Sequence, residues 1–340
     1  MSDIKIKIDS LYKIFGKNPK EALEHVKQGV GKDELLEKYN HVLGLSDINI
    51  DIVDKSIQVI MGLSGSGKST LIRHINRLIE PTAGNVFVDG SDVLKYDENT
   101  LREFRRTRTA MVFQRFALMP HMTILKNVSL GLELQGKKEE EIRNSAMKWI
   151  EKVGLNGYED RYPQHLSGGM QQRVGLARAL TNDTDILLMD EAFSALDPLI
   201  RKDMQDILLN LQEELHKTVV FITHDLDEAL KIGDRIAILK DGIMDQEGLP
   251  VDILLNPKTE YVSNFVEDVN RSRVLKAKHI MEKANGADLS KGMPVNENDF
   301  IESFIDKVVA ERPEFIVVQD SDNNNIGSLS TKRLSEVLKK

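Results

Sequence analysis

The sequence contains no cysteine among its 340 residues and no long apolar run. The absence of cysteine excludes disulfides and metal or iron–sulfur sites with cysteine ligands. No apolar run reaches the roughly 18 residues that a membrane-spanning helix needs. The N-terminus alternates charged residues with isoleucine and lacks the apolar core of a signal peptide. We therefore expect a cytoplasmic chain whose contact with a membrane comes through a partner.

An excess of positive charge is also absent. Lys and Arg number 46 and Asp and Glu number 54, so the formal net charge is −8. This balance argues against a nucleic-acid binder, which usually has a basic domain. Hydrophobic residues at 41% and charged residues at 29% are ordinary for a folded protein, so general disorder is excluded.

Short apolar runs alternate with helical patterns through most of the chain. Strands are expected at 57–61, 111–113, 186–189, 219–223 and 236–239, and helices at 68–79, 139–153 and 170–180. This alternation predicts an α/β domain with a largely parallel sheet. A polar, lysine- and glutamate-rich insertion at about 16–43 predicts short surface helices.

The pattern changes near residue 269. The last segment predicts a helix at 300–310, a strand at 315–319, a turn, a strand from 326 and a helix at 331–338. We expect two domains, an α/β domain at 1–268 and a small α+β domain at 269–340.

A phosphate-binding motif follows the strand expected at 57–61. Its sequence GLSGSGKS fits G-x-x-x-x-G-K-[ST] and opens a helix, the context that the motif requires. Glycines let backbone amides turn toward phosphate oxygens, and the helix N-terminus adds its positive dipole. The alternative is a glycine-rich turn that merely precedes a helix. The predicted phosphate-binding residues are Gly62, Ser64, Gly65, Ser66, Gly67, Lys68, Ser69 and Thr70.

A second strand ends in two carboxylates, Asp190 and Glu191. In a parallel α/β sheet, ligands bind at the carboxyl ends of the strands. Together with Ser69, Asp190 can hold Mg²⁺, while Glu191 can act as the base for the attacking water. Without the upstream phosphate motif, the more common interpretation of two carboxylates at a strand end is that they are simply exposed to solvent.

The segment LSGGMQQR at 166–173 places Ser167, Gly168 and Gly169 before a helix. Their amides and hydroxyl form a second anion site, separate from the phosphate motif. One nucleotide needs no second loop at the far end of its own chain, so we expect a head-to-tail pair of chains with each ATP between them.

At this point the sequence resembles the nucleotide-binding subunits of ATP-binding cassette (ABC) transporters over roughly residues 8–265. The resemblance implies a P-loop ABC-type nucleotide-binding domain that uses ATP and Mg²⁺. It implies that Gln114 in VFQ contacts the cation or the attacking water and that His224 in ITHD binds the γ-phosphate. It also implies that Asp197 in SALD couples the two sites, although Asp197 can equally cap the helix beginning at Pro198.

The family stacks an aromatic residue on adenine. Phe15 fits the family spacing before a glycine better than Tyr12 does, and core packing is the alternative for both.

The insertion at 16–43 and the flanking motifs closely resemble the ATPase subunit of glycine betaine/proline importers, which carry compatible solutes. This resemblance implies a homodimer at the cytoplasmic face of the membrane, integral-membrane permease subunits and an extracytoplasmic substrate-binding protein or domain. Two alternatives remain: an importer of another small solute, such as an amino acid or polyamine, and a soluble ABC ATPase without a transport role.

The C-terminal segment resembles one cystathionine-β-synthase-type (CBS) module. Such modules usually work in pairs, so a single copy implies pairing across the homodimer, and a truncated chain is the alternative. The resemblance implies a response to ionic strength, with contact to anionic lipid or cyclic di-AMP. The cluster of Arg271, Arg273, Lys276 and Lys278 suits anionic headgroups, and a solvated linker is the alternative.

Overall fold

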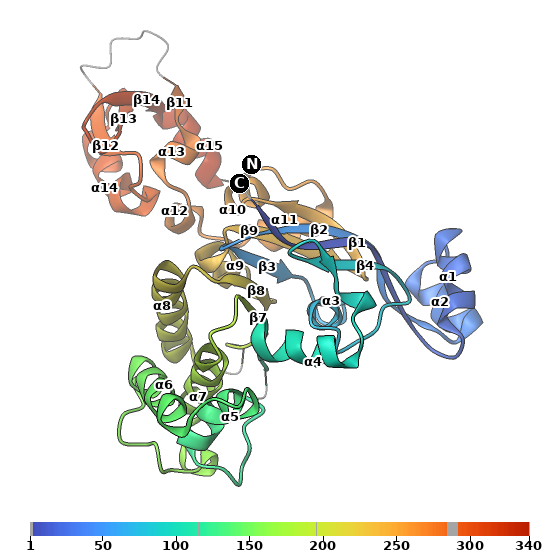
Figure 1. Ribbon diagram of the computed structural model, residues 1–340. Coiled ribbons are helices and arrows are strands. Elements are labelled where there is room, and N and C mark those ends of the chain that lie inside the picture. Colours follow the sequence, from blue (N-terminus) through green and yellow to red (C-terminus); the bar gives the residue numbers. More distant parts are fainter. Residues whose placement is uncertain (1–2, 115, 195, 284–291, 340) are drawn as a thin grey trace. The chain divides into compact units, whose positions relative to one another are not determined.

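The computed structural model describes residues 3–114, 116–194, 196–283 and 292–339. The chain divides into two compact units, Met1–Glu247 and Gly248–Lys340 (Figure 1). Each unit has its own sheet or sheets. The second unit starts before the expected boundary at 268/269, because two helices that follow the first unit, α10 (Pro250–Leu255) and α11 (Glu260–Val266), group with the C-terminal residues.

The first unit is built on a six-stranded sheet in the order β10-β9-β3-β8-β7-β6. Neighbours from β9 to β6 pair in parallel, as the strand–helix alternation predicts. Every residue of β3, β7 and β8 is buried, which explains their uninterrupted apolar runs. The strands are β3 (Ile57–Met61), β6 (Thr109–Val112), β7 (Ile186–Asp190), β8 (Thr218–Thr223), β9 (Arg235–Lys240) and β10 (Ile243–Gly248).

A second, antiparallel sheet has the order β2-β1-β4-β5. Its strands are β1 (Ile4–Phe15), β2 (Val42–Val53), β4 (Ala83–Val88) and β5 (Ser91–Asp92). Within β1, the sequence predicts a strand only at residues 4–8, where isoleucine alternates with lysine. The β1–β2 register shifts between Ile8 and Leu11, where Ser10 has a φ of 45°. This bulge interrupts the two-residue period by which a strand is identified.

Helices flank the central sheet, and three of them, α5 (Ile124–Leu134), α6 (Glu139–Lys152) and α7 (Gly168–Thr181), pack on one another as a helical lobe (Figure 1). Helix α3 (Lys68–Ile75) is shorter than the helix expected at 68–79. It ends at Ile75, and Arg77 just beyond it takes the left-handed conformation, with a φ of 52°. The remaining helices around this sheet are η1 (Val93–Lys95), α4 (Glu98–Thr107), η2 (Pro163–His165), α8 (Pro198–Leu215) and α9 (Leu226–Ile232).

The insertion between β1 and β2 contains two helices, α1 (Pro19–Lys27) and α2 (Lys32–Tyr39). They have a small apolar core of their own with the ends of β1 and β2. Its buried members are Ile14, Ala22, Leu23, Val26, Leu35 and Leu43. The insertion is thus anchored on the antiparallel sheet.

The second unit holds a four-stranded sheet in the order β11-β14-β13-β12. The order α14, β13, turn, β14, α15 follows the expected sequence of elements. Besides α10 and α11, its elements are α12 (Arg271–Val274), α13 (Ala277–Ile280), β11 (Glu282–Lys283), β12 (Met293–Asn296), α14 (Ile301–Glu311), β13 (Phe315–Gln319), β14 (Asn325–Ser330) and α15 (Thr331–Lys339).

Within the ranges that the structure describes, no helix is both long and apolar enough to cross a bilayer.

The small core of the insertion gives a direct test of the fold. Leu35 is 0% exposed and its neighbour Leu36 is 50% exposed. Leu35→Ala removes buried methyl groups and leaves a cavity, so it should lower the free energy of unfolding by about 2–5 kcal/mol. The matched change Leu36→Ala should alter it by no more than about 0.5 kcal/mol. Denaturant unfolding of both variants measures the difference, and equal effects would contradict this packing.

Candidate functional site

The phosphate motif forms the loop between β3 and α3. Gly62 and Gly67 have φ values of 148° and 102°, which L side chains rarely adopt. A Cβ on Gly62 would lie 2.2 Å from the Leu239 carbonyl oxygen, and a Cβ on Gly67 would lie 2.5 Å from the Gly44 carbonyl oxygen. Both positions therefore require glycine for conformation and for space.

The loop contains a buried polar group that suits an anion. Ser66 is 4% exposed, and its hydroxyl is buried with no hydrogen-bond partner among the described residues. A buried hydroxyl without a partner is costly, and a phosphate oxygen would relieve that cost. The same loop leads into the N-terminus of α3, where backbone amides and the helix dipole favour negative charge.

Lys68 lies within the curve of this loop and is also 4% exposed. Its ammonium donates to the carbonyl oxygens of Gly62 at 2.8 Å and Leu63 at 3.1 Å. A carboxylate oxygen of Glu191 is 3.6 Å away. Burial lowers the pKa of the Lys68 ammonium, and the carboxylates of Glu191 and Asp190 oppose that shift.

The carboxyl end of β7 brings the second predicted group to the loop. Asp190, 3% exposed, accepts hydrogen bonds from the Ser69 hydroxyl at 2.7 Å and from Arg73 Nη2 at 3.0 Å. Sequence reasoning missed Arg73. Its position four residues after Ser69 on α3 is the signal that could have placed it on the same face.

Glu191 is the centre of a polar cluster just after β7. Its φ of 46° turns the chain at the strand end. Its carboxylate accepts a hydrogen bond from Gln114 Nε2 at 3.0 Å, and His224 Nδ1 lies 3.7 Å from the same oxygen, Oε2. Ser194 joins them, since Gln114 Nε2 also donates to its hydroxyl at 3.3 Å. The structure thus brings together three predicted residues that are far apart in the sequence, Gln114, Glu191 and His224.

The residues present also fit a divalent cation. A hydroxyl and a carboxylate, Ser69 and Asp190, lie together at the mouth of the loop. Among the described residues, no group of three or more His, Asp or Glu side chains could hold a metal ion. Oxygen ligands with few protein donors suit Mg²⁺, which usually keeps waters and substrate phosphates in its coordination sphere.

Ser167, Gly168 and Gly169 lie at the N-terminus of α7, in the helical lobe (Figure 1). Ser167 and Gly168 are exposed, and the Ser167 hydroxyl caps the helix by accepting from the Met170 amide at 3.3 Å. Asp197 caps α8 in the same way, accepting from the Ile200 amide at 3.1 Å. The capping interpretation of Asp197 is therefore correct, and its coupling role stays a prediction.

The two aromatic candidates differ in exposure. Phe15 is 40% exposed, and its ring lies against Gly44, where a Cβ would be 2.8 Å from it. The Gly44 carbonyl in turn lies beside Gly67 of the loop. Tyr12 packs against the core of the insertion, and burial raises the pKa of its hydroxyl. Phe15 is thus the exposed one of the two, and its stacking on a base stays a prediction.

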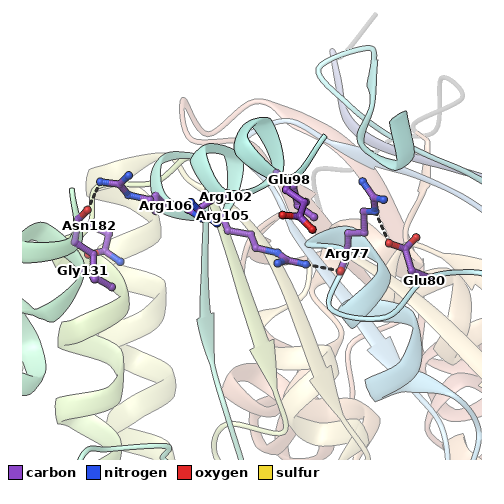
Figure 2. A pocket seen from close by; sticks show the side chains of 10 residues that line it. Arg77, Glu80, Glu98, Arg102, Arg105, Arg106, Gly131 and Asn182 are labelled. Carbon is purple, nitrogen blue, oxygen red and sulfur yellow. Dashed lines mark hydrogen bonds and ion pairs between the residues drawn. The ribbon is translucent and has the colours of Figure 1, made fainter. Parts of the chain in front are cut away.

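A cavity of about 600 Å³ lies elsewhere on the first unit, where α4 faces the helical lobe (Figure 2). Basic side chains dominate it, and Arg77 is paired with Glu80 at 2.6 Å. Sequence reasoning did not predict this arginine groove, because its members come from four separate segments. Its lining residues are Arg77, Glu80, Glu98, Leu101, Arg102, Arg105, Arg106, Gly131, Leu134 and Asn182.

Known proteins are similar to this chain in sequence and in fold. Residues 45–194 match the family model described as ABC transporter. The chain is 57% identical over 289 residues to the glycine betaine transport ATP-binding protein OpuAA of Bacillus subtilis, covering 85% of this chain and 69% of that protein. It is 49% identical over 335 residues to the glycine betaine/proline betaine transport system ATP-binding protein ProV of Escherichia coli, covering 98% and 83%.

A solved structure is also similar, the dimeric post-hydrolysis state of the ATP-binding cassette MJ0796 bound to ADP and Pi. It is 34% identical, with a TM-score of 0.62, and the match covers 72% of this chain and 98% of that one. The expected P-loop α/β fold class is confirmed. The chain therefore belongs to the ABC transporter family, as one of its ATP-binding proteins, which are ATPases coupled to transport.

Proposed function

We propose that this chain is the ATPase subunit that drives uptake of glycine betaine or a related compatible solute through a separate permease. The observation that carries the proposal is the 49% identity to ProV, which spans 98% of this chain. That span includes the insertion and the C-terminal unit as well as the cassette. The alternatives are an importer of another small solute, such as an amino acid or polyamine, and a soluble ABC ATPase without a transport role.

The loop and α3 form the phosphate site of this proposal. The Ser66 hydroxyl and the Lys68 ammonium are the buried groups that gain a partner when phosphate binds. Phe15 stacks on adenine from the end of β1, since any base offers a face for stacking. The residues assigned to the nucleotide are Phe15, Gly62, Ser64, Gly65, Ser66, Gly67, Lys68, Ser69 and Thr70.

The residues assigned to Mg²⁺ are Ser69, Asp190 and Gln114. When bound, Mg²⁺ neutralises charge on the phosphate oxygens and so favours attack by water. The Ser69 hydroxyl and the Asp190 carboxylate already lie 2.7 Å apart. Arg73 holds the other oxygen of Asp190, which fixes the orientation of that carboxylate.

Glu191 is assigned as the general base. Its carboxylate lies between Lys68, Gln114 and His224, so the base, the phosphate-binding lysine and two groups that can orient water share one cluster. Arrival of phosphate draws the Lys68 ammonium away from Glu191, leaving that carboxylate free to accept a proton from water. His224, whose side chain is exposed, can then hydrogen-bond the γ-phosphate.

A second copy of the chain completes each site in this proposal. Ser167, Gly168 and Gly169 present amides and a hydroxyl at the exposed start of α7, where ATP held by the other copy can reach them. Asp197 lies at the start of α8 and can couple the two sites. The dimeric MJ0796 structure supports this assembly.

The membrane partner is assigned to the arginine groove of Figure 2. Four arginines around one cavity suit a permease segment that carries carboxylates. Docking there places the chain peripherally on the cytoplasmic face of the membrane, and a substrate-binding protein or domain delivers the solute from outside. No nucleic acid takes part.

The C-terminal unit is assigned as a single CBS-like regulatory module at 269–340 that senses ionic strength. A cavity of about 360 Å³ there is lined by Lys332 and Arg333 together with Glu282 and Glu336. The ligands proposed for the module are cyclic di-AMP or anionic lipid. Of the four-residue basic cluster, Arg271 is 7% exposed and donates to the Val337 carbonyl, so it is not available to a headgroup. Arg273, Lys276 and Lys278 remain as candidates.

The first prediction concerns Glu191. Glu191→Gln keeps the size and hydrogen-bonding capacity of the side chain but removes the base, so ATP binding should persist while turnover falls by about 10²–10⁴-fold. Glu214→Gln, at an exposed carboxylate on α8, is the control and should match wild type. Radiolabelled ATP binding and phosphate release measure both properties. Rapid hydrolysis by the Glu191 variant would remove the assignment.

A second prediction concerns the cation. Asp190→Asn and Ser69→Ala should each raise the Mg²⁺ concentration for half-maximal ATPase activity by about ten- to a hundredfold. Ser129→Ala removes a hydroxyl in the helical lobe and should leave the Mg²⁺ dependence unchanged. A Mg²⁺ titration at saturating ATP gives the values. An unchanged titration for both site variants would place the cation elsewhere.

A third prediction concerns the cargo. With its permease and binding protein in discs of anionic lipid, the ATPase rate should rise on addition of glycine betaine, and the rise should grow with ionic strength. Stimulation without salt dependence would keep the cargo and remove the sensing role of the C-terminal unit. Intact ATPase activity with no response to betaine would contradict the cargo.

A further inference from the structure

Lys32, the first residue of α2, contacts the phosphate loop from the insertion. Its ammonium donates to the Gly65 carbonyl at 3.1 Å and lies 3.5 Å from Asp241 Oδ1. The side chain is 32% exposed, although its helix is a polar surface element. The contact joins the insertion directly to a peptide group of the loop.

This contact holds one peptide group of the loop from both sides. The carbonyl of the Gly65–Ser66 peptide accepts from Lys32, and its amide donates to the Leu63 carbonyl at 3.2 Å. A peptide held at both ends cannot rotate without breaking a hydrogen bond. Gly65 has a φ of 79°, and a Cβ added to it would meet no atom within 4 Å, so packing alone does not restrain it.

The next carbonyl of the loop is also held from outside. The Gly242 amide donates to the Ser66 carbonyl at 3.0 Å, and Asp241 of the same turn pairs with Lys32. The insertion and the β9–β10 turn therefore support adjacent peptides of the loop, and they are linked to each other. The carbonyls of Gly65 and Ser66 thus both accept hydrogen bonds from groups outside the loop.

We infer that Lys32 is a positioning residue for the nucleotide, through which the insertion sets the affinity of the phosphate loop for ATP. It acts by fixing the Gly65–Ser66 peptide, and with it the curve of the loop that presents the Ser66 hydroxyl to phosphate; its positive charge adds to the favourable potential around the loop. The inference depends on the proposed assignment of the loop as the phosphate site of ATP.

The test compares variants by steady-state ATPase kinetics and by calorimetric titration with ATP. Lys32→Met removes the charge and the donor, and should raise the KM and the Kd for ATP by about three- to tenfold while kcat changes by less than about twofold. Lys32→Arg should restore values near wild type. The matched control, Lys38→Met, removes an exposed lysine of the same helix that pairs with Glu34, and should have no effect.

Thermal unfolding without nucleotide separates this role from a structural one. Lys32→Met should unfold within a few degrees of wild type; if it does not, Lys32→Gln, which keeps a neutral donor, replaces it in the comparison. Lys68→Ala separates the inference from the assignment on which it rests. Lost binding in that variant with an unchanged KM for Lys32→Met would overturn the inference alone. Unchanged binding in the Lys68 variant would overturn the phosphate-site assignment itself.

Discussion

The burial of the Lys68 ammonium is the constraint on which the rest of the site depends. A charge that is 4% exposed is stable only with close partners, and here they are two loop carbonyls and the carboxylate of Glu191. The loop must therefore curve over the lysine, and β7 must end beside it. The glycines of the loop satisfy the first requirement, and the parallel sheet satisfies the second.

The same arrangement suggests how nucleotide binding and hydrolysis are linked in the proposed mechanism. The Lys68 ammonium lies 3.6 Å from a carboxylate oxygen of Glu191, and both are next to the Ser69–Asp190 pair. In the proposed mechanism, a phosphate group competes with Glu191 for the lysine, so the ligand that is to be hydrolysed would also release the base. Gln114 and His224, on loops after β6 and β8, approach Glu191 from separate parts of the sequence. The carboxyl edge of the sheet brings all these groups together.

The phosphate loop, Asp190 and Glu191 were predictable from the sequence, since their residue types follow from the chemistry of phosphate, whereas Gln114 and His224 were expected only from the family resemblance. The central strands were predictable for a related reason, because buried parallel strands are continuous apolar runs. Other features depend on contacts between distant segments, which no local pattern encodes. The bulge at Ser10 breaks the alternating pattern, so most of β1 was not predicted. Helix α3 is shorter than predicted, because the chain takes a left-handed conformation at Arg77. The contact of Lys32 with Gly65 and the arginine groove arise only when separate elements meet in the fold.

In the proposed assembly, each ATP lies between the phosphate loop of one copy and the start of α7 of the other. The most direct measurement mixes two inactive chains, Lys68→Ala and Gly168→Asp, in the assembled transporter. In a mixed dimer, the intact loop of the second chain faces the intact Ser167–Gly169 segment of the first. We predict that ATPase activity, absent from each variant alone, returns on mixing, because one complete site forms. A mixture as inactive as its components would contradict the claim that two copies share each site.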